Sequence, residues 1–221
     1  MPQIPYINIH KHGPGQSEDE VAVRSIFSQD IPQAVGNYKG QLSIGTHPWH
    51  LDPNNIEAQL ALVEKFSGHE SVIAIGEIGL DRKTPAPLEL QKEAFVGQLD
   101  IAVRLNKPVI IHCVKAYPEI ISILKSTQFS GNVIFHGYDQ NRQIAEQLIE
   151  NGFCLSFGRA LLNEKSNASK LFAKIPDDRF FLETDEADID IRKIYERAAI
   201  LKNRDVEEVK KIVYDNFNDC F

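Results

Sequence analysis

The sequence has little that would tie it to a membrane or to an oxidising compartment. Apolar runs such as 109–111 fall far short of the ~20 residues that a membrane-spanning helix needs. The first residues lack the basic region and apolar core of a secretory signal, so we expect a cytoplasmic protein with no membrane partner. The 3 cysteines are widely spaced and form no CxxC, which argues against a disulfide framework and favours a reducing compartment.

Positive charge is also scarce, with 24 lysines and arginines against 31 acidic residues and a formal net charge of -7. This balance argues against a nucleic-acid binder that uses a basic face. It does not exclude an enzyme that meets phosphates through bound cations, because the ions bring the positive charge. The sequence contains no GxGxxG, GxxxxGKS/T, GxSxG or HExxH, which excludes dinucleotide-binding, P-loop, α/β-hydrolase and zincin motifs.

The remaining pattern is that of a globular α/β protein, in which short β-rich runs alternate with stretches of helical period. We predict strands at 4–10, 41–46, 72–77, 108–112, 132–136, 153–157 and 180–184, and helices at 56–66, 88–105, 140–150, 189–202 and 206–217. Several of the strands are apolar at consecutive positions, which is typical of parallel strands buried on both faces. No linker or internal repeat interrupts the chain, so we expect a single domain, 1–221.

Potential metal ligands stand at six of the seven predicted strand ends. They are His10 and His12, His47, Glu77, His112, His136 and Asp185. The carboxyl ends of the strands converge on one mouth in a parallel barrel, whereas an open doubly wound sheet would spread them along a line. We therefore predict a TIM-like (β/α) barrel of seven or eight parallel strands, closed or nearly closed, and leave open whether it is distorted or has an incomplete eighth strand.

Each candidate ligand also has a simpler interpretation. His10 and His12 are two apart, so they face the same side of a strand and can chelate one cation, but such a pair alone is a weak signal. Glu77 would be a buried carboxylate, which is costly unless it is paired in an ion pair or bound to a metal. His112 or His136 alone would more often be a hydrogen-bonded core histidine. The combination favours a metal site.

The sequence leaves the roles of two further residues at strand ends open. Asp185 could cap the helix that follows it, and His47 could be a substrate contact or could support a ligand without binding the metal itself.

The motifs occur in an order that resembles the TatD family of metal-dependent deoxyribonucleases. The matching pieces are NIHKH at 8–12 (family D-x-H-x-H), GTHP at 45–48 (G-x-H-P), GEIGLD at 76–81 (G-E-x-G-L-D), the histidine motifs at 108–112 and 135–137, ETD at 183–185 and the closing N-x-x-x-x-F at 216–221. The resemblance runs over nearly the whole chain, and GEIGLD is its most specific piece.

The resemblance implies a hydrolase with two divalent metal ions and DNA as substrate. One ion would be held by His10, His12, Glu77 and Asp185, and the second by Glu77, His112 and His136. Glu77 and Asp185 would be catalytic, with Asp185 as general base, and His47 and Asp81 would contact substrate. Imidazole and carboxylate ligands suit zinc, manganese or nickel, whereas the family is usually regarded as magnesium-dependent, so we expect Mg, Mn or Zn.

Departures from the family pattern fall around the expected ligands. Asn8 stands where the family has aspartate, Val114 where it commonly has arginine, and Glu186 and Asp188 where it has a small residue and an aromatic. These changes leave open a metallohydrolase of a small phosphate ester, lactone or amide, or a non-catalytic metal-binding relative. The sequence predicts no oligomeric state.

Overall fold

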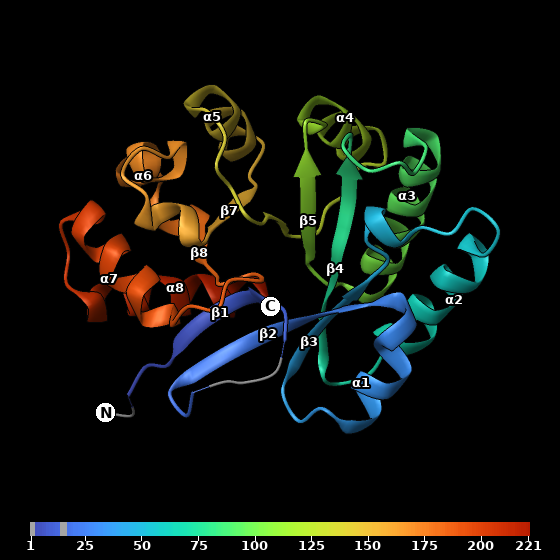
Figure 1. The fold of residues 1–221 in the computed structure, drawn as a ribbon, viewed down its shortest axis with the longest axis horizontal. Coiled ribbons are helices and arrows are strands. Elements are labelled where there is room, and N and C mark those ends of the chain that lie inside the picture. The colour runs from blue at the N-terminus through green and yellow to red at the C-terminus, as the bar shows by residue number, and fades with distance from the viewer. Residues whose placement is uncertain (1–2, 14–16) are drawn as a thin grey trace. The chain divides into compact units, whose positions relative to one another are not determined.

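The computed structural model describes residues 3–13 and 17–221, which alternate between strands and helices along the chain (Figure 1). The strands are β1 Tyr6–Lys11, β2 Glu20–Phe27, β3 Gln41–Gly45, β4 Val72–Asp81, β5 Val109–Val114, β6 Val133–Phe135, β7 Cys154–Phe157 and β8 Phe180–Leu182. The α-helices are α1 Ile31–Asn37, α2 Ile56–Ser67, α3 Leu88–Leu105, α4 Tyr117–Ser126, α5 Arg142–Glu150, α6 Asn167–Leu171, α7 Ile191–Lys202 and α8 Val206–Cys220.

Each of the seven predicted strands coincides with an observed strand, and β2 is the strand that the sequence analysis missed. Parallel neighbours are usually joined by a crossover of a dozen or more residues that contains a helix. Residues 12–19 connect β1 to β2, and the described part of that segment holds no helix. The absence of the usual helical spacer explains why β2 was not recognised.

The five predicted helices correspond to α2, α3, α5, α7 and α8, whereas α1, α4 and α6 were not predicted. Helix α3 has the predicted bounds 88–105 and ends at Asn106, whose left-handed φ of 50° closes the last turn. Helix α8 begins with the predicted capping box: the Glu208 amide donates to Asp205 Oδ1 at 2.7 Å, and the Asp205 amide donates to Glu208 Oε2 at 3.0 Å. Among the described residues, no helix is long and apolar enough to cross a membrane.

The contacts divide the chain into two compact units, which we name by their place in the sequence. The terminal unit is Met1–Arg24 with Phe135–Phe221, and the middle unit is Ser25–Ile134. The boundaries fall inside β2 and inside β6. Within each unit the strand order follows the order along the chain. The single domain 1–221 stays a prediction.

In the terminal unit, β1 is held from both sides. It pairs in parallel with β2, and helices α7 and α8 pack against it. The buried Tyr195 of α7 donates its hydroxyl to the Ile7 carbonyl at 2.8 Å and accepts from the Ile7 amide at 3.0 Å. At the end of β1, the Asp185 amide donates to the His10 carbonyl at 3.0 Å, and the His12 amide donates to the Asp185 carbonyl at 3.1 Å. These bonds fix the segment after β8 beside β1.

In the middle unit, β3, β4 and β5 pair in parallel, with α3 packed against β4 and α2 beside α3 (Figure 1). Gly76 lies opposite Ile110 and Ile78 opposite Ile111, so Glu77 is the extra residue of a β-bulge. Such bulges redirect a side chain, often next to a functional site. Gly79 has a φ of 145°, and a Cβ there would lie 2.0 Å from a backbone oxygen of β5, so only glycine fits.

Candidate functional site

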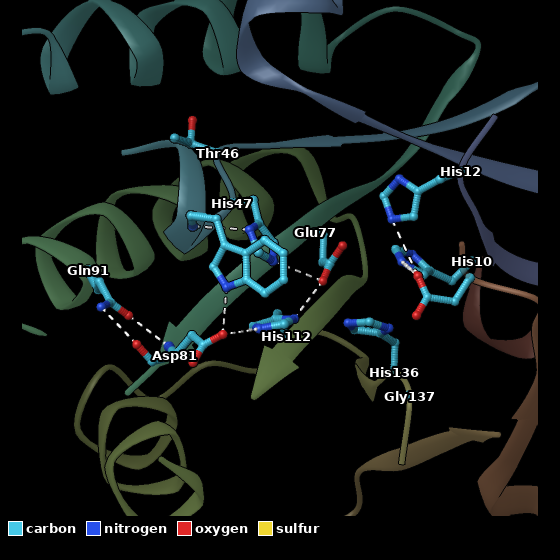
Figure 2. A network of polar contacts seen from close by, with 12 residues as sticks. His10, His12, Thr46, His47, Glu77, Asp81, Gln91, His112, His136 and Gly137 are labelled. Atoms are coloured by element: carbon cyan, nitrogen blue, oxygen red, sulfur yellow. Dashed lines mark hydrogen bonds and ion pairs between the residues drawn. The ribbon is translucent and has the colours of Figure 1, made fainter. Parts of the chain in front are cut away.

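The first group of polar side chains, which we call the Glu77 cluster, lies at the carboxyl ends of β3, β4 and β5 and consists of His47, Glu77, Asp81 and His112. Figure 2 shows His47 and His112 pointing toward Glu77. Glu77 Oε1 lies 2.7 Å from His112 Nδ1 and 3.2 Å from His47 Nε2. The ligand atoms of these three residues lie within 4.8 Å of one another, a spacing that suits a metal ion.

The hydrogen bonds of His47 assign its tautomer. Its Nδ1 accepts from the Trp49 amide at 3.1 Å, so a proton on this ring must sit on Nε2, the atom that faces Glu77. The geometry favours a role for His47 in holding the Glu77 carboxylate, one of the two roles that the sequence left open.

His112 lies between two carboxylates. Its Nδ1 faces Glu77, and its Nε2 lies 3.0 Å from Asp81 Oδ2. Histidines that bind metals usually donate their other ring N–H to a carboxylate in this way, which fixes the ring and raises its basicity. Burial works to raise the pKa of Asp81, but hydrogen bonds from His112, Trp49 and the Lys83 amide hold it below its usual value. Asp81 is therefore ionised and can accept a hydrogen bond from Nε2 of His112.

Two buried glutamines of α3 hold the strand ends that carry this cluster. Gln91 accepts from the Asp81 amide at 2.8 Å and donates to the Asp81 carbonyl at 3.1 Å. Gln98 accepts from the Thr46 amide at 2.6 Å and donates to the Thr46 carbonyl at 3.3 Å. The sequence analysis missed both, although their spacing of seven puts them on one face of the helix, a signal that could have been used.

The second group, which we call the Asp185 cluster, belongs to the terminal unit and consists of His10, His12, His136, Glu183 and Asp185. Asp185 Oδ1 lies 3.6 Å from His10 Nε2 and 3.5 Å from His12 Nε2. These separations are too long for hydrogen bonds. Two donors bonded to one cation at about 2.1 Å each lie roughly 3.0–3.5 Å apart, so the spacing fits ligands that share an ion.

His136 is supported by a carboxylate, as His112 is in the other unit. Its Nδ1 lies 3.6 Å from Oε1 of the fully buried Glu183, and the same oxygen accepts from the Gly137 amide at 2.7 Å. Burial works to raise the pKa of Glu183, but His136 and His10 hold it below its usual value. The ligand atoms of His10, His136 and Asp185 lie within 4.8 Å of one another. Glu183 thus lies on the Nδ1 side of His136, which leaves Nε2 for a metal.

Asp185 also reaches a cavity. Its backbone is left-handed, with a φ of 54°, and its side chain is 41% exposed. A cavity of about 400 Å³ in the terminal unit is lined by Asp185 together with Gly158, Arg159, Glu183 and Glu186. A carboxylate that lies both beside two imidazoles and on a cavity wall can exchange a proton with a molecule bound there.

The structure groups the predicted ligands by unit. His10, His12, His136 and Asp185 come together in the Asp185 cluster, and Glu77 and His112 in the Glu77 cluster. The two predicted substrate contacts lie in the Glu77 cluster, where Asp81 is 1% exposed and fully engaged in hydrogen bonds. This burial favours a positioning role for Asp81 over a substrate contact.

The departure at Asn8 has a structural explanation. Asn8 is buried in β1, and its Nδ2 donates to Glu20 Oε1 and to Thr184 Oγ1, each at 2.9 Å, while its Oδ1 accepts from the Thr184 amide at 3.0 Å. An amide at position 8 therefore complements the carboxylate that β2 contributes at position 20. Glu20 was not foreseen, because β2 was not recognised.

The chain is similar to known proteins in sequence and in fold. The family model described as "TatD related DNase" matches residues 27–221. The uncharacterized metal-dependent hydrolase YabD of Bacillus subtilis is 31% identical over 81% of this chain and 76% of its own. The solved structure of YjjV, a TatD homolog from Escherichia coli, has a TM-score of 0.82 at 21% identity and covers 98% of this chain and 97% of that one. The lactonase Lmo2620 of Listeria monocytogenes has a TM-score of 0.66 at 14% identity and covers 99% of this chain and 95% of that one.

The fold and the clusters of metal-binding side chains define a metal-dependent hydrolase with a TIM-like (β/α) barrel, as predicted from the sequence. Among the residues that the structure describes, the sheet has eight strands, within the predicted seven or eight, and the strand that was not recognised in the sequence is β2, near the start of the chain. The chain belongs to the TatD family.

Proposed function

We propose that this protein is a deoxyribonuclease that hydrolyses phosphodiester bonds of DNA with a water molecule and two divalent cations. The observation that carries the proposal is the Asp185 cluster. Its half-exposed carboxylate lies 3.5–3.6 Å from the Nε2 atoms of two histidines and also lines a cavity. The description of the matching family as a DNase supports the choice of DNA.

The proposed ligands are those that the sequence suggested, namely His10, His12, Glu77, His112, His136 and Asp185. Bound cations would activate a water molecule and offset the negative charge of the phosphodiester. The chain itself supplies the orientation, because Asp81 fixes the ring of His112 and Glu183 fixes that of His136. The donor set of imidazoles and carboxylates suits Mn or Zn, and Mg is the choice that the family resemblance adds.

Asp185 is the proposed general base. Its carboxylate would take a proton from the attacking water at Oδ1 or Oδ2, and its exposure lets that proton pass on to solvent. Glu77 is the other proposed catalytic group, and the N–H of His47 holds its Oε1. Arg159, on the wall of the same cavity as Asp185, is the proposed contact for the phosphate, in place of the arginine that Val114 replaces.

A second candidate is hydrolysis of a small phosphate ester, lactone or amide. Glu186 lies on the cavity wall beside Asp185, and its charge would repel a phosphate backbone. The fold is also shared by the lactonase from Listeria monocytogenes. A non-catalytic metal-binding relative would keep the same clusters but hydrolyse neither kind of substrate.

The test measures nucleotide release from end-labelled single-stranded DNA with Mg, Mn, Zn or Ni, and after chelation. We expect release that a chelator abolishes and that Glu77→Gln and Asp185→Asn lower by about 10²- to 10⁴-fold. Glu150→Gln and Asp215→Asn, which change acidic residues of α5 and α8, are the matched controls and should keep full activity.

A parallel panel of bis(p-nitrophenyl) phosphate, a γ-lactone and an anilide separates the two enzymatic candidates. Turnover of the lactone or anilide without release from DNA would favour the second candidate. No release from DNA with any of the four metals would refute the proposed deoxyribonuclease.

A further inference from the structure

Trp49, the only tryptophan of the chain, is exposed and yet fixed in place. Trp49 is 59% exposed, although an indole ring is large and mostly apolar. Its backbone lies in the short 3-10 helix Pro48–His50, where its amide donates to His47 Nδ1 at 3.1 Å. Its ring N–H donates to Asp81 Oδ2 at 2.6 Å. The ring is therefore held at both ends while much of its surface faces solvent.

The bond to Asp81 ties the indole to the proposed metal ligands. The same oxygen, Asp81 Oδ2, lies 3.0 Å from His112 Nε2, and His112 Nδ1 lies 2.7 Å from Glu77 Oε1. Figure 2 shows Asp81, His112 and Glu77 in this order along the cluster. The indole also meets the rings of His47 and His112 edge to face, with centroids 5.3 Å and 6.1 Å away. The exposed ring thus stands next to the Glu77 cluster in a set orientation.

Other rings adjoin the same turn. Phe27, at the end of β2, lies 4.6 Å from the ring of His50 and 5.6 Å from that of His47, measured between centroids. The turn that carries Trp49 therefore rests on aromatic side chains and on Asp81. A ring that is fixed in this way loses little conformational freedom when a ligand covers it.

We propose that Trp49 is a stacking platform for a nucleobase of the substrate, next to the phosphodiester that is cleaved. The inference rests on the proposed deoxyribonuclease function and names how a substrate is recognised. Bases of single-stranded nucleic acids stack on aromatic side chains without regard to sequence, because every base has a π-face. Acidic residues outnumber basic ones by 31 to 24, so stacking supplies affinity for a nucleic acid that the net charge does not.

The probe is a thymidine tetranucleotide with phosphorothioate linkages, which resist hydrolysis, and the comparison ligand is an abasic tetramer of the same charge. Magnesium-loaded protein is titrated with each, and the emission of Trp49 is followed. We expect a saturable change in emission with the thymidine tetramer, and weaker binding with no such change for the abasic tetramer.

Variants separate stacking from an indirect structural role. Trp49→Ala should weaken binding of a fluorescein-labelled tetramer by about 10-fold, as expected for the loss of one base–aromatic stack, whereas Trp49→Phe should retain most of the affinity. If Trp49 acted only through its bond to Asp81, the two variants would weaken tetramer and metal binding equally, since both lack the ring N–H. Leu105→Ala, which removes an exposed apolar side chain at the end of α3, is the control and should bind like wild type.

The outcomes separate this inference from the proposed function. Cleavage of DNA together with equal tetramer binding by wild type and Trp49→Ala would overturn the stacking inference and leave the deoxyribonuclease standing. Failure of the tetramer to bind, together with no cleavage of DNA under any metal, would overturn both. Equal losses in Trp49→Ala and Trp49→Phe would reduce Trp49 to a positioning residue for Asp81.

Discussion

Asn8→Asp restores the residue that the family commonly has at this position, and we expect it to destabilise this protein strongly. In the native structure the Asn8 amide donates to Glu20 Oε1 at 2.9 Å, and both side chains are buried. An aspartate would bring two carboxylates to that distance. Their repulsion at 2.9 Å is about 5–6 kcal/mol at an effective dielectric constant of ~20, and Lys11, whose Nζ lies 3.5 Å from Glu20 Oε1, offsets part of it.

The pair can escape this repulsion by keeping one proton. Holding a proton at pH 7 on a carboxyl whose unfolded pKa is ~3.9 costs about 4 kcal/mol, which is less than the repulsion. We therefore expect Asn8→Asp to lower the free energy of unfolding by about 3–4 kcal/mol at pH 7. The pKa of the pair is raised by folding, so the loss is small below about pH 4 and grows as pH rises through the raised pKa.

The assay is urea unfolding, followed by circular dichroism at pH 7 and pH 4.5 in the presence of a chelator. Asn8→Asp combined with Glu20→Gln reverses the polarity of the hydrogen bond and should recover most of the lost stability. Asn54→Asp, an exposed control, should change stability by at most about 0.5 kcal/mol. The reasoning is refuted if Asn8→Asp unfolds like wild type, or if Glu20→Gln does not rescue it.

Two further predictions test the packing of β4 and the chemistry of the cysteines. Gly79→Ala should fail to fold or lose several kcal/mol of unfolding free energy, because its Cβ would overlap a backbone oxygen 2.0 Å away. Gly36→Ala, with no atom within 4 Å of the new Cβ, should be neutral or slightly stabilising in the same urea assay. Burial raises the pKa of the Cys154 thiol to about 11. At pH 8, Cys154 of the native protein should therefore react with a thiol reagent about 100-fold more slowly than Cys154 of the urea-unfolded chain. Equally fast reaction of the native and unfolded protein would contradict this burial.

The strands and helices could be predicted because their signals are local. Consecutive apolar residues mark β5 and β6, and the capping box at Asp205 marks the start of α8. β2 was missed because a parallel neighbour without a helical spacer has no local signal that tells it from a loop. Its alternation of buried and half-buried residues is visible only once β1 is placed beside it.

The candidate ligands could be recognised in the sequence because histidines and carboxylates at successive strand ends are an unusual pattern. The groups that hold them were missed, because they come from elsewhere in the chain. Gln91 and Gln98 reach the strand ends from α3, and Glu183 supports His136 across a separation that sequence spacing does not reveal. The β-bulge that directs Glu77 is a register shift between strands and likewise has no signal in one strand alone.

The two clusters share one arrangement around the proposed metal ligands. In each unit an imidazole is oriented by a buried carboxylate: Asp81 lies behind His112, and Glu183 behind His136. Both supports are buried and accept hydrogen bonds within the protein. The groups that can meet a substrate are instead on the surface or on the wall of the cavity, and they include Trp49 in the middle unit.

The departures from the family follow the same division. Asn8 donates a hydrogen bond to Glu20, so this departure is compensated inside the terminal unit. Glu186, by contrast, adds a negative charge to the cavity wall beside Asp185. Because Glu186 is not among the proposed metal ligands, Glu186→Ala should change the preference between DNA and small esters while leaving metal affinity intact. An equal loss of metal binding, measured by calorimetry, would mean that the cavity wall and the ligands act as one unit.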